Sequence, residues 1–97
     1  MQVFKVLIPP QVQQKIKDQA YVIAMDKPSA ALKWYDTIQE KLSSLEQMPK
    51  RCPIAPESIH FDFEVRHLIS GHYRILFAVQ DDSVKVLDFK AGRQNKP

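Results

Sequence analysis

The chain has 97 residues, 44% hydrophobic and 26% charged, which suits one folded domain with a modest core and excludes wholesale disorder. Its net charge of +3 is a mild basic bias, compatible with an acidic protein partner or with nucleic acid. Cys52 is the only cysteine, which excludes an internal disulfide and a thiolate zinc site. No stretch approaches the about 20 apolar residues of a membrane span. We therefore expect residues 1–97 to form a single cytoplasmic domain with no bound metal or cofactor.

The first part of the chain predicts a strand and a helix. Residues 3–8 are apolar almost throughout, which indicates a strand in the interior of a sheet. Pro9 and Pro10 end this strand and favour the first turn of a helix. The next apolar residues have helical spacing, and they are Val12, Ile16, Ala20 and Ile23. We expect this helix to be interrupted before Pro28, because the residue that precedes a proline is pushed out of the helical conformation.

A second helix is expected from about Ser29 to Gln47, with Ser29 or Asp26 as its N-cap. Its apolar residues have the most regular helical spacing in the chain, which indicates core packing rather than a binding face. They are Ala31, Trp34, Tyr35, Ile38, Leu42 and Leu45. Two amphipathic helices in tandem predict a helical hairpin that covers one face of the sheet.

Three strands are predicted between Glu64 and Arg93, after a long loop that contains three prolines in residues 48–57. Runs rich in β-branched and aromatic residues are broken by turn residues at 70–72 and 81–83, as in a meander of hairpins. In the middle run, the residues of an apolar face alternate with those of a second face, and Arg74 is the first residue of that second face. A charged side chain is unusual in a central strand. The order β-α-α-β-β-β predicts an α+β fold, a helical hairpin packed on a small, mostly antiparallel sheet.

Strand parity sorts the basic side chains of this meander. Across a hairpin with an even loop, residues that share a face are separated by an odd number of positions. His67 and Arg74 are seven positions apart and are expected on one face, whereas Arg66 and Arg74, eight apart, are expected on opposite faces. An odd loop or a bulge would reverse this assignment.

Two stretches resemble the RelE/ParE family of bacterial toxins from type II toxin–antitoxin modules. The first, AALKWYDTIQEKLSSLEQMPKRCPIAPES, is similar to the family's second helix and the loop that follows it. The second, VRHLISGHYRILFAVQDDSVKVLDFKAGR, is similar to the family's terminal meander, with Tyr-Arg opening one strand and a basic residue closing the last. The resemblance implies a small cytosolic toxin of the plasmid-stabilisation type. It also implies a co-encoded antitoxin that holds the toxin inactive, and it allows an oligomer with that antitoxin.

The family divides into ribosome-dependent mRNA endonucleases, similar to RelE, and inhibitors of DNA gyrase, similar to ParE. An endonuclease needs groups that deprotonate a 2′-hydroxyl, stabilise the phosphorane and protonate the leaving oxygen. Arg74 matches the nuclease-branch arginine after tyrosine and is a candidate for binding the scissile phosphate. His67, beside it by parity, would do acid–base work, and Arg93 completes this catalytic set.

Three departures favour the ParE-like branch. No Tyr or His follows Arg93 to complete the acid–base set, and Arg93 is one position out of register with the nuclease-branch arginine on an ungapped match. Lys90 stands where many relatives have histidine, and a solvated lysine is a poor general acid at pH 7. We therefore expect a toxin that acts by binding DNA gyrase. An mRNA endonuclease that engages the ribosome is one alternative, and an inactive homologue with only an interaction role is another.

The candidates for binding the target or the antitoxin are basic side chains of the meander and an aromatic pair of the second helix. They are Arg66, Lys85, Lys90, Arg93, Trp34 and Tyr35. Each also has a structural interpretation. An ion pair with Glu57 or Glu64 would explain Arg66, and Asp88 is a candidate partner for one of the arginines. A solvated basic edge that discourages strand pairing would explain the lysines.

Overall fold

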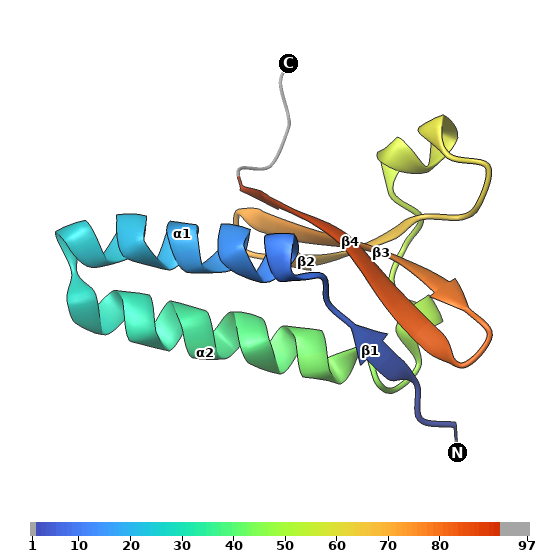
Figure 1. The fold of residues 1–97 in the computed structure, drawn as a ribbon, viewed down its shortest axis with the longest axis horizontal. Helices are drawn as coiled ribbons and strands as arrows, with labels where there is room; N and C mark the ends of the chain where they lie inside the picture. The colour runs from blue at the N-terminus through green and yellow to red at the C-terminus, as the bar shows by residue number, and fades with distance from the viewer. Residues whose placement is uncertain (1, 92–97) are drawn as a thin grey trace.

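The computed structural model describes residues 2–91 and has the expected α+β architecture (Figure 1). The elements in chain order are β1 (Lys5–Leu7), α1 (Pro10–Asp26), α2 (Pro28–Ser44), the short 3-10 helices η1 (Pro49–Arg51) and η2 (Pro56–His60), β2 (Arg66–Ser70), β3 (Tyr73–Gln80) and β4 (Ser83–Ala91). The predicted order β-α-α-β-β-β is confirmed. Among the helices within residues 2–91, none has the length and apolar character needed to cross a membrane.

A proline begins each of the two long helices. Pro10 and Pro28 stand in the first helical turn, where a missing N–H group leaves no hydrogen bond unmade. Lys27, between the helices, is extended with φ −152°, because a residue that precedes proline is pushed out of the helical region. Lys27 is also the N-cap of α2 and makes no side-chain capping bond, so the expectation that Ser29 or Asp26 caps this helix is wrong.

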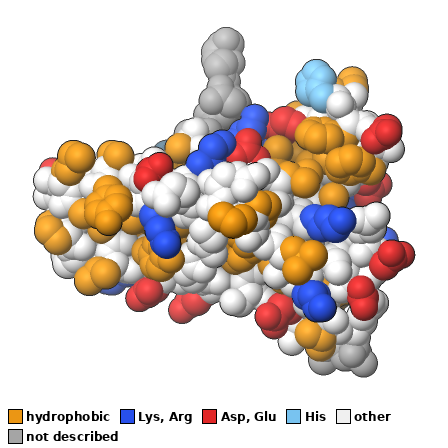
Figure 2. All heavy atoms as spheres, in the orientation of Figure 1, with side chains coloured by type: hydrophobic (Ala, Val, Ile, Leu, Met, Phe, Trp, Pro, Cys, Tyr) orange, Lys and Arg blue, Asp and Glu red, His pale blue; other side chains and the backbone are white. Residues whose placement is uncertain are grey.

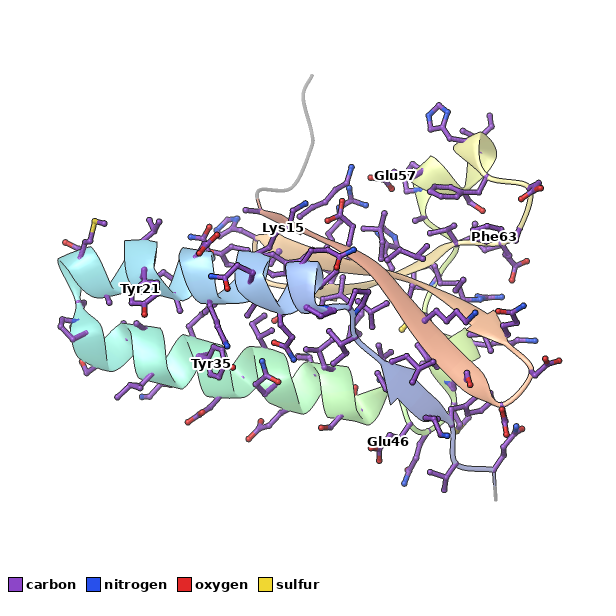
Figure 3. All side chains as sticks on the ribbon, viewed as in Figure 1. Lys15, Tyr21, Tyr35, Glu46, Glu57 and Phe63 are labelled. Atoms are coloured by element: carbon purple, nitrogen blue, oxygen red, sulfur yellow. The ribbon has the colours of Figure 1, made fainter. Side chains whose placement is uncertain are left out.

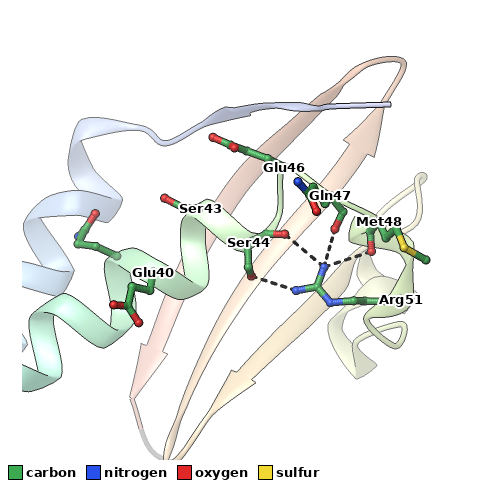
Figure 4. Close-up of a pocket in the computed structure, with 8 residues that line it drawn as sticks. Glu40, Ser43, Ser44, Glu46, Gln47, Met48 and Arg51 are labelled. Atoms are coloured by element: carbon green, nitrogen blue, oxygen red, sulfur yellow. Dashed lines mark hydrogen bonds between the residues drawn. The ribbon is translucent and has the colours of Figure 1, made fainter. Parts of the chain in front are cut away.

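Arg51 closes the C-terminal end of α2 (Figure 4). Its Nη1 donates to the carbonyl oxygens of Gln47 at 2.7 Å, Met48 at 3.2 Å and Ser44 at 3.3 Å, and its Nη2 donates to Ser44 Oγ at 2.9 Å. A cation at this position complements the partial negative charge of the helix end. The helix ends at Ser44, before the predicted Gln47.

The sheet has the strand order β1-β4-β3-β2. The last three strands form the predicted antiparallel meander, and β1 pairs with β4 in parallel. The prediction of an interior first strand is therefore wrong, because β1 lies at an edge and is bonded to β4 alone. Its apolar run has another cause: Val6 packs into the core while Leu7 stays 41% exposed on the opposite face.

Both hairpin turns use a residue with positive φ. Gly71 has φ +60° and joins β2 to β3, and Asp81 has φ +57° in the turn between β3 and β4. The first turn keeps even parity, with Ile69 opposite Arg74. A bulge shifts the pairing of β3 with β4 between Leu76 and Phe77, but it does not disturb the pairing of β2 with β3.

The main core lies between the helical hairpin and one face of the sheet (Figure 1). Its buried residues are Val12, Ile16, Ile38, Leu42, Ile75, Val86 and Phe89. Trp34 of α2 is half-buried and meets the rings of Tyr73 and Phe89 edge-on, with centroid separations of 5.1 and 6.0 Å. The far end of the hairpin extends beyond the sheet, so the helices cover only part of this face with their sheet-proximal turns.

The other face of the sheet, called the outer face below, is partly roofed by the loop that runs from η1 to β2. Ala55 and Val65 of this loop are buried against Leu76 of β3, with Leu87 of β4 packed beside them. Two backbone hydrogen bonds tie the loop down, from Ala55 to Val65 and from His67 to Pro53. The long proline-rich segment is thus an ordered cover, and it carries η2 over the outer face.

Candidate functional site

The outer face brings together one carboxylate and three basic groups. Arg74 on β3, His67 on β2 and Lys90 on β4 project from neighbouring strands, and Glu57 descends on them from η2. The parity prediction that His67 and Arg74 share a face is confirmed, since Arg74 Nη1 lies 3.0 Å from His67 Nδ1. We call Glu57, His67, Arg74 and Lys90 the outer-face cluster; Figure 3 labels Glu57 within it.

Glu57 and Arg74 form a two-point ion pair. Arg74 donates through Nη1 to Glu57 Oε1 at 3.0 Å and through Nη2 to Oε2 of the same carboxylate. Lys90 Nζ lies 3.3 Å from that Oε2. Arg74 is only 7% exposed, so its guanidinium is enclosed with its partner rather than open to solvent. The fork of Arg74 is therefore occupied by a carboxylate of the same chain.

This pairing changes the titration of both partners. The hydrogen bonds from Arg74, helped by Lys90 and opposed by partial burial, lower the pKa of Glu57 from its usual 4.5 to about 2. The same contact with Glu57 raises the pKa of Arg74. Both groups are consequently charged throughout the neutral range, and Glu57 has little tendency to accept a proton there.

His67 differs from these two groups, because its surroundings favour the neutral form of the side chain. Burial, followed by the nearby charge of Arg74, lowers the pKa of His67, and the opposing effect of Glu57 is smaller. The ring is therefore neutral at pH 7. Because the Arg74 guanidinium can only donate, His67 Nδ1 accepts in this contact, and the single ring proton lies on Nε2.

The family of the chain follows from its similarity to known proteins. The model of the family described as the ParE toxin of the type II toxin–antitoxin system parDE matches residues 6–96. The chain belongs to the ParE toxin family. Its fold is similar to a solved chain of the chromosomal ParDE toxin–antitoxin system from P. aeruginosa, with a TM-score of 0.74, 16% identity, and coverage of 94% of this chain and 98% of that chain. Comparison with curated protein sequences gives no match. Membership in this family implies an antitoxin partner.

In this ParE-family chain, Arg66 has a structural role. It lies on the opposite face from Arg74, as parity predicts, because it pairs with Phe77 across the hairpin. Its Nη1 donates to the carbonyl oxygen of Cys52 at 2.6 Å, and its Nη2 donates to Glu64 Oε1 at 2.8 Å. Arg66 therefore anchors the loop to β2, and the expected ion pair is with Glu64 rather than with Glu57.

Asp88 does not pair with either arginine, so that expectation is wrong. Its carboxylate lies 2.6 Å from Lys15 Nζ at the start of α1, and Figure 3 places Lys15 at this end of the helix, beside β4. Asp88 pairs with Leu76 of β3 on one side, but β1 pairs only with the residues from Ser83 to Lys85, so within residues 2–91 the other edge of β4 has no strand beside Asp88. Lys15 reaches Asp88 at this open edge. The contact joins the helical layer to the sheet.

The remaining candidates fall into three places. Lys85 is exposed on the outer face, opposite Ala78 of β3 and away from the outer-face cluster. Trp34 and Tyr35 are half-buried and pack against the main core, as expected for core residues. Arg93 lies outside the residues that the structure describes. Among the described candidates, His67, Arg74 and Lys90 come together in the outer-face cluster, and Arg66 and Lys85 line a separate cavity.

Glu57 is the site residue that analysis of the sequence alone missed as a partner of Arg74. The sequence suggests Glu57 only as a partner of Arg66, because the register of a loop against a sheet cannot be derived from strand parity. One signal was present: Pro56 can begin a helical turn, and an acidic residue directly after it sits in that first turn. A buried arginine on a central strand also requires a carboxylate from outside the meander once Asp88 is engaged elsewhere.

Proposed function

We propose that the chain is a toxin that acts by binding DNA gyrase in the cytoplasm and that a cognate antitoxin neutralises it by binding. The observation that carries this proposal is the occupied fork of Arg74. A nuclease would use this guanidinium for the scissile phosphate, yet both terminal nitrogens hold Glu57 and the residue is 7% exposed. Family membership supports the antitoxin partner.

The acid–base chemistry of the outer-face cluster also favours a binding toxin. Glu57, with a pKa of about 2, is too weak a base to take a proton from a ribose hydroxyl near neutral pH. His67 presents its lone pair to Arg74 rather than to solvent. Lys90, held near the carboxylate, is a donor with three protons and no lone pair in its charged form. The described residues thus supply charge balance more readily than a general base and a general acid.

One observation keeps an mRNA endonuclease as a second candidate. His67 and Arg74 are in direct contact on the outer face, as the nuclease interpretation of the sequence requires, with a separation of 3.0 Å. In that case, a substrate phosphate would have to displace Glu57 from Arg74 on the ribosome. The two functions differ in the molecule that fails first in a poisoned cell, and this difference defines the experiment.

The test is expression of the chain from a tightly regulated promoter in a susceptible bacterium, with separate pulse labelling of DNA and protein and mapping of transcript ends. We expect DNA synthesis to fail first, with filamentation, intact transcripts and accumulation of gyrase cleavage complexes. His67→Gln should retain this toxicity, because a toxin that acts by binding needs no proton transfer at this position.

Two results would contradict the proposal. New transcript ends inside translated codons that disappear with Arg74→Ala would establish the endonuclease. A chain that folds, as judged by circular dichroism, but has no effect on growth would identify an inactive homologue with only an interaction role. Co-expression of the cognate antitoxin is the matched control. It should restore growth whether the toxin binds gyrase or cleaves mRNA.

A further inference from the structure

A cavity of about 350 Å³ lies at the end of the sheet where β3 turns into β4, separate from the outer-face cluster. Ala78 of β3 and Leu87 of β4 line its apolar part, and Phe63 of the covering loop forms a wall. Lys50, Arg66 and Lys85 contribute the basic part of the lining. Figure 3 shows Phe63 beside the end of the sheet where β3 and β4 turn. The cavity is thus an apolar hollow with cations at its margin.

The hollow continues across β4 toward the N-terminal strand. A second depression, along β1, is lined by Leu7 and shares Lys85 and Leu87 with the first. Leu7 is 41% exposed and Phe63 is 47% exposed, so the two ends of this strip present large apolar side chains to solvent. Figure 2 shows hydrophobic side chains in close proximity to Lys and Arg side chains on the visible surface over β1 and β4. An extended segment of several residues would fit such a strip.

The charges along the strip are unbalanced. Glu64 is paired with Arg66, which leaves Lys50 and Lys85 as the additional cations of the lining. Among the residues described here, no carboxylate lies within ion-pair distance of either lysine. Two unneutralised ammonium groups flanking an apolar hollow favour a ligand that carries negative charge on both sides of an apolar group.

We propose that this strip, from Leu7 across Lys85 and Leu87 to Phe63, is a docking site for an acidic protein segment with one apolar anchor residue. The anchor fills the hollow between Ala78 and Phe63, and flanking carboxylates meet Lys50 and Lys85. The proposal rests on the proposed function in one respect, that the chain works by binding other proteins. It does not depend on whether gyrase is the target.

A protein segment fits the strip better than single-stranded nucleic acid does. Nucleic acid is held by stacking on aromatic side chains along a continuous basic track. Here Phe63 is the single aromatic residue of the hollow, the floor is aliphatic, and the Glu64 carboxylate stands in the lining. An apolar side chain between two acidic residues matches this combination.

The experiment is selection of a random 12-residue peptide library on phage against the immobilised full chain. We expect the enriched peptides to carry an aromatic or large aliphatic residue flanked by Asp or Glu. Fluorescence anisotropy of the most enriched peptide should show at least a tenfold weaker affinity for the Lys50→Glu/Lys85→Glu variant. The matched control is Lys17→Glu/Lys33→Glu, which makes the same charge change on exposed helix positions and should bind with unchanged affinity.

The remaining outcomes overturn the proposal. Enrichment without acidic residues, or equal affinity of the two double variants, would show that the strip does not select charge. Tighter binding of a labelled oligouridylate than of any selected peptide, lost in the Lys50→Glu/Lys85→Glu variant, would assign the strip to nucleic acid. Failure of the peptide selection with DNA synthesis still poisoned in cells would reject this site and leave the proposed function intact.

Discussion

At the scale of single residues, the ion pair between Glu57 and Arg74 is the most buried ion pair among residues 2–91. An arginine that is 7% exposed on a central strand is stable only with a compensating charge, and Glu57 provides that charge through both of its oxygens. The pair also fixes His67, which accepts a bond from the same guanidinium. Removing the carboxylate would leave a buried cation without a partner.

Glu57→Gln is expected to destabilise the fold by about 2–3 kcal/mol at pH 7, since a neutral amide cannot balance Arg74. Glu57 has a folded-state pKa of about 2 and an unfolded-state pKa near its usual 4.5. A lowered pKa stabilises the fold above pH 4.5, and this contribution is lost as the pH falls through 2. The stability difference between wild type and variant should therefore shrink across this window. Urea unfolding at a series of pH values measures it.

Glu64→Gln is the control for this pH series. Glu64 also pairs with an arginine, but its side chain is 53% exposed, so its loss should change stability by less than about 1 kcal/mol. A stability difference between wild type and Glu57→Gln that stays constant from pH 5 to pH 2 would show that folding does not lower the pKa of Glu57, and that its charge does not stabilise the fold.

The contact between His67 and Arg74 could be predicted from sequence, whereas the identity of the arginine's partner could not. Parity depends only on the two-residue turn at Gly71, and that turn is local to the chain. The partner comes from a loop 17 positions upstream, whose path is set by the burial of Ala55 and Val65. No local pattern encodes that path, so Glu57 was paired with the wrong arginine.

At the scale of elements, helices were more predictable than strand positions. The spacing of Ile38, Leu42 and Leu45 has one explanation, a buried helical face, and these residues are 0–2% exposed. An apolar run in a strand has two explanations, because it can belong to a central strand or to an edge strand that is covered by a helix. The β1 strand belongs to the second kind: it pairs with the first three residues of β4 and, in the described part of the chain, has no strand on its other side.

Arg51→Ala tests how the end of α2 is held. The substitution removes hydrogen bonds to three carbonyl oxygens and should cost about 1 kcal/mol, because the side chain is exposed and water partly replaces it. Hydrogen exchange should speed up for the amides of the last turn of α2 and stay unchanged near Pro28. Lys50→Ala, at the neighbouring exposed position, is the control and should leave exchange unaffected. Equal exchange in both variants would show that Arg51 does not cap the helix.

At the scale of the whole molecule, two layers share one continuous core. Val6 and Leu68 pack against both the cluster under the helices and the cluster formed by Leu45, Cys52 and Phe77. The contact between Lys15 and Asp88 joins the same layers at the open edge of β4. Helices and sheet are therefore expected to lose their structure together, even though the hairpin extends past the sheet.

Cooperative unfolding is the prediction that tests this connection. In urea, the far-ultraviolet circular dichroism of the helices and the fluorescence of Trp34, which lies against Tyr73 and Phe89, should give coincident transitions. Ile38→Ala, at a position that is 0% exposed, should lower the stability by 2–5 kcal/mol in both signals. The same kind of truncation at Leu32, which is 71% exposed near the end of the hairpin, should change it by less than about 0.5 kcal/mol. If both signals are lost at lower urea than the protection of the β3 and β4 amides from hydrogen exchange, the hairpin unfolds as a unit of its own, and the shared core does not couple the two layers.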